Sequence, residues 1–491
     1  MFDCVIVGFG PVGALLSLFL SKQNLKVAII DKNKEIYPLP RAIHFDEEIM
    51  RIFQMIGLSE KISSIARIGT KGMHFVDDNN NLLMVRKGSE KVGDQGWQKS
   101  WYFHQPELEK VLRKEVKSSK LVKCYLGFQA KSIKQDDCEV KLTCVENNNK
   151  KELCLKSRFL IGCDGANSIV GSYIGGETID YGLKEKYLVV DLKVDNRFKK
   201  VNDLPDYTVQ HCSLKRPATR CYISKKRRRW EIKVLPSDKE NEIKNEKNIW
   251  KFLNKWIDKR CGYIERAEIY TFKSIIKKNW FKGRVLLAGD SAHLSPPFLG
   301  QGMCAGVRDV ASLSWRLHCY LKQGFPKSIL KSYQTERLPH VKKFIQLATE
   351  CGRIMSDPKI NLKTNKKGNT KLFDFPRPRL EHGFFKRSEL SGTLLPQFIE
   401  KNVKTDERLK YNFILLSRVP VQQKLSHNLK RFVTTIKASG EIRNWMENND
   451  QLAVLIRPDK YIFSGAKNEI EVSDLLEHLS QLSKKNKLFS Y

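Results

Sequence analysis

The chain has 491 residues, of which 41% are hydrophobic and 10% aromatic, and this composition excludes an intrinsically disordered protein. At roughly 150 residues a domain, the length is enough for about two or three domains. Lysine and arginine number 88 against 54 aspartates and glutamates, so the formal net charge is +34. Such a charge favours anionic partners, although a solvated surface rich in lysine explains it more simply.

The N-terminal residues predict a strand, a glycine-rich turn, a helix and a second strand. These are, in order, residues 2–7, the G-x-G-x-x-G motif at 8–13, residues 14–20 and residues 26–30. The run from Cys4 to Ser21 is apolar and about long enough to span a bilayer. No basic segment precedes this run, and glycines and a proline interrupt it, so we expect neither a membrane span nor a targeting peptide.

The three glycines of the first turn predict a dinucleotide site. Gly8 allows the tight turn, Gly10 lets the backbone approach a pyrophosphate, and Gly13 lets the helix pack closely on the strand. The helix N-terminus offers free N–H groups to phosphates. Asp31 follows at the spacing, about 20 residues, at which a carboxylate accepts the ribose hydroxyls of an adenosine half. The motif leaves NAD and FAD open.

Two further apolar runs end on a carboxylate. Residues 158–164 (RFLIGCD) lead into Asp164-Gly165, and residues 284–290 (RVLLAGD) end at Asp290. After a Pro296-Pro297 turn, the stretch from Gly300 to Met303 (GQGM) begins a helix. Glycines there let the backbone approach a ligand closely, with the positive end of the helix directed at it.

The ordered set of glycine-rich turn, Asp-Gly and Gly-Asp resembles the class A flavoprotein monooxygenases, the p-hydroxybenzoate hydroxylase family. The resemblance extends over nearly the whole chain. It is closest to the 3-(3-hydroxyphenyl)propionate hydroxylase branch, through YPLPRAIHFDEE (37–48), RPAT (216–219), RRRWE (227–231) and FLGQGMCAGVRD (298–309). It implies FAD as the resident nucleotide and NAD(P)H as a co-substrate that binds without a second Rossmann unit.

The resemblance also implies roles for single residues. Asp290 would bind the ribityl chain of FAD, Pro297 would cross the isoalloxazine, and Gly300, Gly302 and Met303 would face the flavin pyrimidine. Arg41 and Gln105 would contact FAD, whereas Asp164 and Gly165 would serve both FAD and NAD(P)H. Arg113, in a helix expected at 106–117, would lie near the phosphates, with an ordinary solvated arginine as the equal alternative. The chain departs from much of the superfamily at Asn167 and Gly171, where arginines are usual, and at Cys304, where asparagine is common.

The activity implied is FAD-dependent, NAD(P)H-consuming hydroxylation of a phenol through a flavin C4a-hydroperoxide formed with O₂. His44 is a candidate catalytic residue that helps to ionise the phenol, and a plain hydrogen-bonded loop histidine is the equal alternative. The backbone at Pro297 is a second candidate. We expect His293 to be structural, and we assign the acids at 46–48 no catalysis because acidic residues are common in a first helical turn.

The middle of the chain predicts an antiparallel sheet over the active site. Its expected strands are residues 187–194, 207–212, 220–224 and 230–235. The KKRRR run at 225–229 matches a nucleic-acid patch by pattern, but its place between two strands favours an exposed turn. No nucleic-acid-binding motif accompanies it.

The fold class expected is α/β, with a Rossmann-like FAD-binding domain of the p-hydroxybenzoate hydroxylase type. An interleaved antiparallel-sheet substrate domain and a C-terminal thioredoxin-like domain complete it. The expected boundaries are 1–75, 105–180 and 270–376 for the FAD-binding domain, 76–104 and 181–269 for the substrate domain, 377–396 for a linker and 397–491 for the C-terminal domain. Strands at 411–416, 431–436 and 452–456 and a helix at 472–482 would form that last domain.

The twelve cysteines occur singly, with no C-x-x-C and none after Cys351. They argue against a metal site and against dithiol chemistry, and they fit reduced thiols in the cytoplasm. The C-terminal domain is therefore expected to be structural or to serve a homo-oligomer. Two alternative functions stay open: a flavin reductase or oxidase on the same scaffold, and, more remotely, a basic nucleic-acid-binding protein with a vestigial flavin fold.

Overall fold

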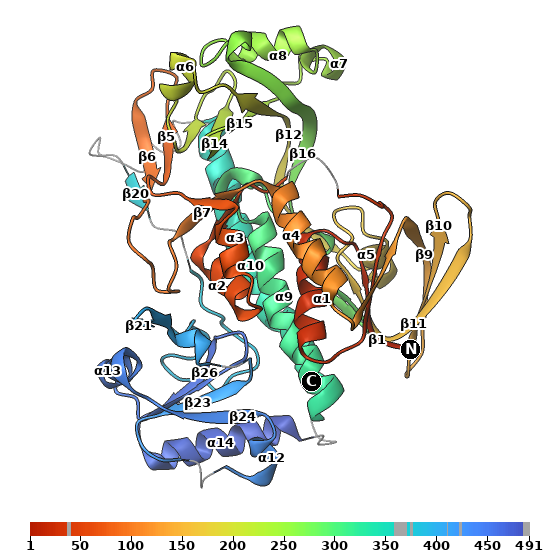
Figure 1. Cartoon of the computed structure of the whole chain (residues 1–491), viewed down its shortest axis with the longest axis vertical. Coiled ribbons are helices and arrows are strands. Elements are labelled where there is room, and N and C mark those ends of the chain that lie inside the picture. The colour runs from red at the N-terminus through yellow and green to blue at the C-terminus, as the bar shows by residue number, and fades with distance from the viewer. Residues whose placement is uncertain (37–40, 358–370, 374–376, 410, 422–424, 485–491) are drawn as a thin grey trace.

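The computed structural model describes residues 1–36, 41–357, 371–373, 377–409, 411–421 and 425–484. A nine-stranded sheet and the C-terminal domain lie at opposite ends of its long axis, and an eight-stranded sheet lies to one side between them (Figure 1). The YPLP segment (37–40) of the 37–48 motif falls outside the described residues. All twelve cysteines are free, and within the described ranges no group of residues is arranged to hold a metal ion.

Apolar β-branched runs form the parallel part of the eight-stranded sheet, in which neighbouring strands run β18-β11-β1-β2-β8. The bounds are β1 (Phe2–Val7), β2 (Val27–Asp31), β8 (Val122–Leu126), β11 (Glu152–Gly162) and β18 (Val285–Leu287). The antiparallel strands β9 (Phe128–Gln135), β10 (Val140–Glu146) and β17 (Phe281–Lys282) extend it. Since the strands are parallel, the residues that follow β1, β2, β11 and β18 meet at one carboxyl edge, where ligands bind in such sheets.

Helices α1 (Pro11–Lys22), α4 (Gln105–Ser118) and α5 (Ile169–Ile174) pack on this sheet. The long α9 (Gly302–His318) packs on α1, and α10 (Ser328–Ser356) packs on α9 and on strands of the nine-stranded sheet. Helices α2 (Glu47–Met55) and α3 (Ser59–Ser63) lie beside a three-stranded sheet of β3 (His44–Asp46), β7 (Ser100–Phe103) and β4 (Ala66–Ile68). Asp46 caps α2, because its Oδ1 accepts the Ile49 N–H at 3.3 Å.

The nine-stranded sheet contains the expected antiparallel strands. Its order is β19 (His293–Leu294), β16 (Gly262–Lys277), β12 (Thr178–Val194), β15 (Arg227–Lys233), β14 (Ala218–Ser224), β13 (Thr208–His211), β5 (Met73–Val76), β6 (Leu82–Arg86) and β20 (Lys371–Phe373). One face packs an apolar core that includes Trp230, Ile232 and residues of α6 (Lys199–Asn202), α7 (Glu240–Ile243) and α8 (Glu246–Leu253).

The expectation of an exposed turn at 225–229 is wrong for its three arginines. Only Lys225 and Lys226 form the turn, and β15 already begins at Arg227. Arg228 is 4% and Arg229 1% exposed. The buried Arg229 is neutralised by Asp191, whose Oδ1 lies 2.7 Å from its Nε, a partner that the local sequence pattern does not reveal.

The C-terminal residues form a separate four-stranded sheet in the order β24-β23-β25-β26. Its elements are β23 (Phe413–Ser417), α12 (His427–Lys430), β24 (Val433–Lys437), α13 (Gly440–Asn448), β25 (Ala453–Ile456), β26 (Ile462–Ala466) and α14 (Glu469–Ser483), preceded by the hairpin of β21 (Ile399–Glu400) and β22 (Val403–Lys404). Strands β23 and β24 are parallel, and the other pairs are antiparallel. The thioredoxin-like assignment and the domain boundaries stay predictions.

The C-terminal sheet packs against α9 through aromatic side chains. The rings of Trp315 and Phe413 lie 5.5 Å apart, and Phe384, from the segment expected as a linker, lies 5.7 Å from Trp315. Residues 377–396 are irregular as expected, but Leu380, Phe384 and Leu395 are buried. None of the helices in the described ranges is long and apolar enough to cross a membrane.

Candidate functional site

The glycines of the first turn have different surroundings. Gly8 has a φ of +105°, and a Cβ there would lie 2.3 Å from the Cys163 carbonyl oxygen. A Cβ on Gly13 would lie 2.0 Å from the oxygen of Gly8, whereas no atom lies within 4 Å of a Cβ placed on Gly10. Gly10 is also the N-cap of α1, and no side chain caps this helix. The turn therefore leaves open space at a helix N-terminus, as a bound phosphate requires.

Asp31 closes the turn from the neighbouring strand. Its Oδ2 accepts the Phe9 N–H at 2.7 Å, and its Oδ1 accepts the Asn33 N–H at 2.8 Å. The guanidinium carbon of Arg113 lies 4.5 Å from the centre of the Phe9 ring. Arg113 from α4 therefore lies beside the glycine-rich turn and is not an ordinary solvated arginine.

Gln105, Glu109 and Arg113 occupy one face of α4, because they are spaced by four residues. The Gln105 Oε1 accepts the N–H groups of Arg41 at 2.9 Å and Ala42 at 2.7 Å, while its Nε2 donates to Glu109 at 2.8 Å. Burial raises the pKa of Glu109. The Nε of Arg113 is buried without a hydrogen-bond partner. A buried guanidinium donor without an acceptor fits an anionic ligand such as a pyrophosphate.

Asp164 and Gly165 form the turn after β11. Asp164 accepts a hydrogen bond from the Ser168 Oγ at 2.5 Å and from the Val170 N–H at 3.3 Å, at the start of α5. Burial raises the pKa of Asp164. Gly165 has a φ of +78° and open space at its Cβ position. The contacts of Asp164 are those of a turn residue, and its role toward a cofactor stays a prediction.

Asp290 lies between β18 and the turn that leads to α9. Its side chain is accessible to solvent, yet the protein around it raises the pKa of its carboxyl group, mainly by desolvation. Both observations describe a carboxylate that is set back from the surface and not covered by other side chains. A hydroxyl-bearing ligand could reach it there.

The backbone around Asp290 is fixed by a buried ion network on α9 and α10. Asp309 accepts hydrogen bonds from the Gly289 N–H at 3.0 Å and the His293 Nε2 at 2.7 Å. The Nε of Arg337 donates to the other Asp309 oxygen at 2.9 Å. His293 is therefore a structural residue, as we expected. Asp309 and Arg337 were not predicted. Asp309 lies in a largely apolar stretch of α9 (AGVRDVA, 305–311), which is a signal of a buried and paired charge, whereas Arg337 lies among polar residues and gives no such signal.

The turn before α9 packs against the side chain of His44 at Gly300. Gly300 has a φ of +66°, and a Cβ there would be 3.1 Å from the His44 ring nitrogen Nδ1. The other nitrogen of the ring lies 2.8 Å from the Ser100 Oγ. Burial, with a contribution from Arg86, lowers the pKa of His44 to about 3, so its imidazole is neutral. A group with this pKa is a weak base near neutral pH, and the catalytic role of His44 stays a prediction.

Helix α9 presents a second N-terminus at the site. Its N-cap is Gln301, and no side chain caps it. Cβ atoms placed on Gly289 and Gly306 would lie 3.1 and 2.6 Å from Val12 of α1, so α1 and α9 pack closely together. Pro297 and Met303 are half-buried on either side of the turn. The two helices can thus direct positive ends toward one ligand.

The nine-stranded sheet fixes the same turn from the other side. The Gln210 Nε2 of β13 donates to the Phe298 carbonyl at 3.3 Å, and Phe298 packs edge-on against Tyr187. The Nη1 of Arg229 donates to the carbonyl oxygen of Arg41 at 2.8 Å. The sheet expected to cover the active site is therefore attached to both segments that would hold the cofactor.

The three departures from the superfamily pattern have different surroundings. Asn167 is exposed. A Cβ on Gly171 would lie 2.9 Å from the Cε of Lys277, near the flexible end of that side chain. The thiol of Cys304 is buried 3.6 Å from the Gly300 carbonyl and 3.8 Å from that of His44. How NAD(P)H is engaged stays a prediction.

Comparison with known proteins identifies the family of the chain. Residues 1–348 match the family model described as FAD binding domain. A probable NADH-specific resorcinol 4-hydroxylase of Rhodococcus jostii is 30% identical over 97% of this chain and 94% of its own. A 3-(3-hydroxy-phenyl)propionate/3-hydroxycinnamic acid hydroxylase of Burkholderia vietnamiensis is 30% identical over 71% of this chain, which spans only 62% of that relative.

Two solved structures share the fold over almost their whole length. The flavin-dependent monooxygenase PieE, in complex with FAD and substrate, has a TM-score of 0.81 with 98% of both chains covered and 17% identity. The aklavinone-11 hydroxylase, in a ternary complex with FAD and aklavinone, has a TM-score of 0.80 at the same coverage and identity. At this identity the similarity establishes the fold.

Proposed function

The chain belongs to the FAD binding domain family and is an FAD-dependent monooxygenase, and we propose that it hydroxylates a phenol at the expense of NAD(P)H and O₂. FAD, when bound, supplies the redox chemistry, since it accepts a hydride from NAD(P)H and activates O₂. The observation that carries the proposal is the pair of helix N-termini without side-chain caps, those of α1 and α9, together with the buried Nε of Arg113 beside the first turn, which has no hydrogen-bond partner.

The residues of the carboxyl edge would bind and orient the cofactor. The open space at Gly10 and the unsatisfied Nε of Arg113 suit the pyrophosphate. Asp31 would accept ribose hydroxyls, and Asp290 would accept one from the ribityl chain. Gln105 holds the backbone of Arg41 and Ala42 against this side of the site.

The turn from Pro297 to Met303 would face the flavin ring. The positive end of α9 there would stabilise negative charge that develops on the reduced ring. His44, neutral and hydrogen-bonded to Ser100, would hold this turn in place rather than remove a proton from the phenol. Phe298 and the sheet residues behind it would exclude water from the reacting ring.

Which phenol is hydroxylated is the finer part of the proposal. The relatives are named for resorcinol and for 3-(3-hydroxyphenyl)propionate, so a neutral and an anionic phenol are both candidates. The nucleic-acid alternative loses its motif, because Arg228 and Arg229 are buried.

The test is to load the purified protein with FAD and follow oxidation of NADH and NADPH with each of these two phenols. We expect a yellow protein in which at least one phenol accelerates the oxidation and is converted to a product with one more hydroxyl group. Oxidation at one rate with every phenol, with hydrogen peroxide as the product, would support the reductase or oxidase alternative instead.

A further inference from the structure

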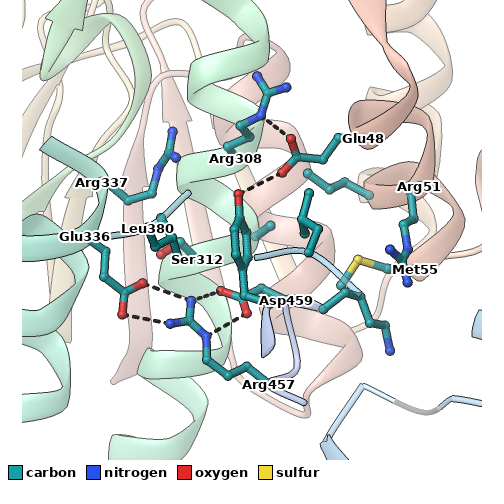
Figure 2. Close-up of a pocket in the computed structure, with 15 residues that line it drawn as sticks. Glu48, Arg51, Met55, Arg308, Ser312, Glu336, Arg337, Leu380, Arg457 and Asp459 are labelled. Carbon is teal, nitrogen blue, oxygen red and sulfur yellow. Dashed lines mark hydrogen bonds and ion pairs between the residues drawn. The ribbon is translucent and has the colours of Figure 1, made fainter. Parts of the chain in front are cut away.

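A tyrosine of the C-terminal domain contacts the ion pairs of the flavin-site helix. Tyr461 lies between β25 and β26, and its hydroxyl donates to the Glu48 Oε1 at 3.3 Å. The Glu48 Oε2 accepts a hydrogen bond from the Arg308 Nε at 2.6 Å (Figure 2). Tyr461 is 8% and Arg308 5% exposed. Glu48, which is half-buried, thus links this tyrosine of the C-terminal domain to Arg308 of α9.

Arg308 continues this path to the turn at the start of α9. Its Nη1 donates to the Gln301 Oε1 at 2.9 Å, and its Nη2 donates to the Asp46 Oδ2 at 2.6 Å. The Gln301 Nε2 in turn donates to the same Asp46 oxygen at 3.2 Å. Both ends of the Gln301 amide are therefore held, and Gln301 lies between the two glycines, Gly300 and Gly302, that would face the flavin.

Asp46 and Arg308 stabilise each other's charged forms. Burial alone would raise the pKa of Asp46, but the Arg308 guanidinium lowers it below its ordinary value. The carboxylates of Asp46 and Glu48 raise the pKa of Arg308 against the opposing effect of burial. Burial keeps Tyr461 neutral by raising its pKa well above the usual range. The tyrosine is thus a neutral donor that orients the Glu48 carboxylate toward Arg308.

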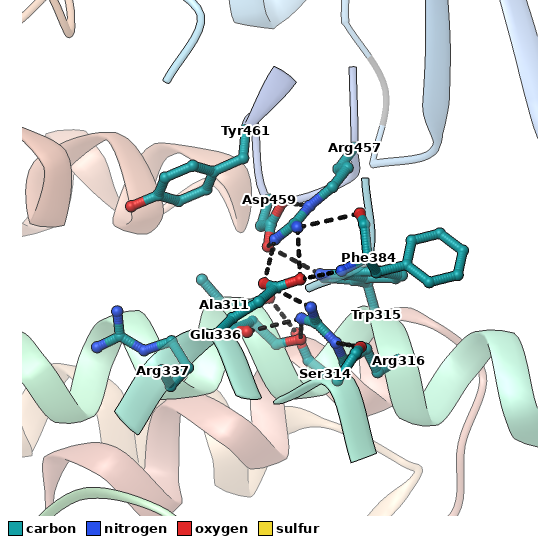
Figure 3. A network of polar contacts seen from close by, with 12 residues as sticks. Ala311, Ser314, Trp315, Arg316, Glu336, Arg337, Phe384, Arg457, Asp459 and Tyr461 are labelled. Atoms are coloured by element: carbon teal, nitrogen blue, oxygen red, sulfur yellow. Dashed lines mark hydrogen bonds and ion pairs between the residues drawn. The ribbon is translucent and has the colours of Figure 1, made fainter. Parts of the chain in front are cut away.

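A second set of contacts docks the same hairpin without Tyr461. Arg457 donates to both oxygens of Glu336 at 2.8 and 2.9 Å and to Asp459, which accepts the Trp315 indole N–H at 2.9 Å (Figure 3). All of these groups lie on α9, α10 or the hairpin. Loss of the Tyr461 hydroxyl would therefore leave the hairpin attached through these contacts.

We propose that Tyr461 is a positioning residue of the flavin site, acting through Glu48 and Arg308 on the turn held by Gln301. This inference rests on the proposed function, because the turn matters only if a flavin lies against it. Without the hydroxyl, Glu48 has one fewer constraint and Arg308 is held less firmly between its two carboxylates. The positive end of α9 is then less well aligned with the ring that it would stabilise.

The experiment compares Tyr461→Phe with a matched variant, Tyr411→Phe. Tyr411 also belongs to the C-terminal region and also contacts α9, where its hydroxyl lies 2.7 Å from the Ser314 Oγ, but this contact lies beyond the middle of the helix. Each variant loses one hydroxyl and keeps its ring. The readouts are the dissociation constant for FAD, the visible spectrum of the bound flavin and the melting temperature.

We expect Tyr461→Phe to raise the dissociation constant for FAD by up to about tenfold and to shift the flavin spectrum, whereas Tyr411→Phe changes neither. Both variants should lose a similar, small amount of thermal stability. Adding Tyr461→Phe to Glu48→Gln should have no further effect on the flavin, because one path carries both.

An unchanged spectrum and dissociation constant in Tyr461→Phe would overturn the inference, as would an equal change in Tyr411→Phe or full additivity with Glu48→Gln. These outcomes differ from a failure of the proposed function, in which the wild-type protein itself would not bind FAD.

Discussion

At the scale of single residues, substitutions of two glycines in the first turn test cofactor binding and folding independently. Gly10→Ala adds a methyl group to open space, whereas Gly13→Ala places one 2.0 Å from the Gly8 oxygen. We expect Gly10→Ala to fold with a melting temperature near that of the wild type in the absence of FAD, and to bind FAD at least about tenfold more weakly. Gly13→Ala should yield little folded protein. Circular dichroism and FAD titration measure both, and tight FAD binding by folded Gly10→Ala would contradict the site.

His44 allows a test by pH. Its pKa in the folded protein is lowered to about 3, so between that value and about 6.5 the unfolded chain binds more protons and stability falls as the pH falls. The variant His44→Gln lacks the imidazole and therefore lacks its contribution to the pH dependence of stability. Between pH 7 and pH 4.5 we expect the free energy of unfolding to fall by roughly 2 kcal/mol more in the wild type than in the variant. Urea unfolding measures this difference.

The same variant distinguishes positioning from catalysis. Loss of a general base costs about a hundredfold to ten-thousandfold in rate, whereas we expect His44→Gln to stay within about tenfold of the wild type when saturated with FAD and phenol. A hundredfold loss, restored by adding imidazole, would reinstate His44 as the base.

At the scale of elements, the docking of the C-terminal hairpin depends on Arg457. Arg457→Met leaves the fully buried Glu336 and Asp459 with less compensation, and breaking such a pair typically costs about 3–5 kcal/mol. The control is Arg443→Met, which removes an exposed pair with Glu447 on α13 and should cost less than about 1 kcal/mol. Chemical unfolding measures both. Equal losses in the two variants would show that the buried network does not hold the domain.

Elements with a strong period could be predicted within a few residues. The expected strand at 2–7 agrees with β1, and the helix expected at 472–482 lies within α14 (Glu469–Ser483). The burial of Arg229 in β15 could not be predicted, because it depends on Asp191, which lies 38 residues away in the chain. From the sequence alone, a charged residue is expected to be exposed unless a buried partner is known.

At the scale of the whole molecule, the sequence itself indicates why the motifs that would bind the cofactor lie together. Each follows a parallel strand, and such strands share one carboxyl edge. The ion pairs that hold these motifs could not be predicted, because their partners are distant: Arg308 and Asp46 are separated by 262 residues. Neither periodicity nor spacing carries information about such pairs.

The central claim is that one atom of O₂ enters a phenol. The most direct measurement is the mass of the product formed under ¹⁸O₂ by the FAD-loaded protein with NADH or NADPH and the phenol that accelerates its oxidation. The account predicts a product that carries one ¹⁸O atom. A product without label, or NAD(P)H consumed only to form labelled hydrogen peroxide, would contradict it.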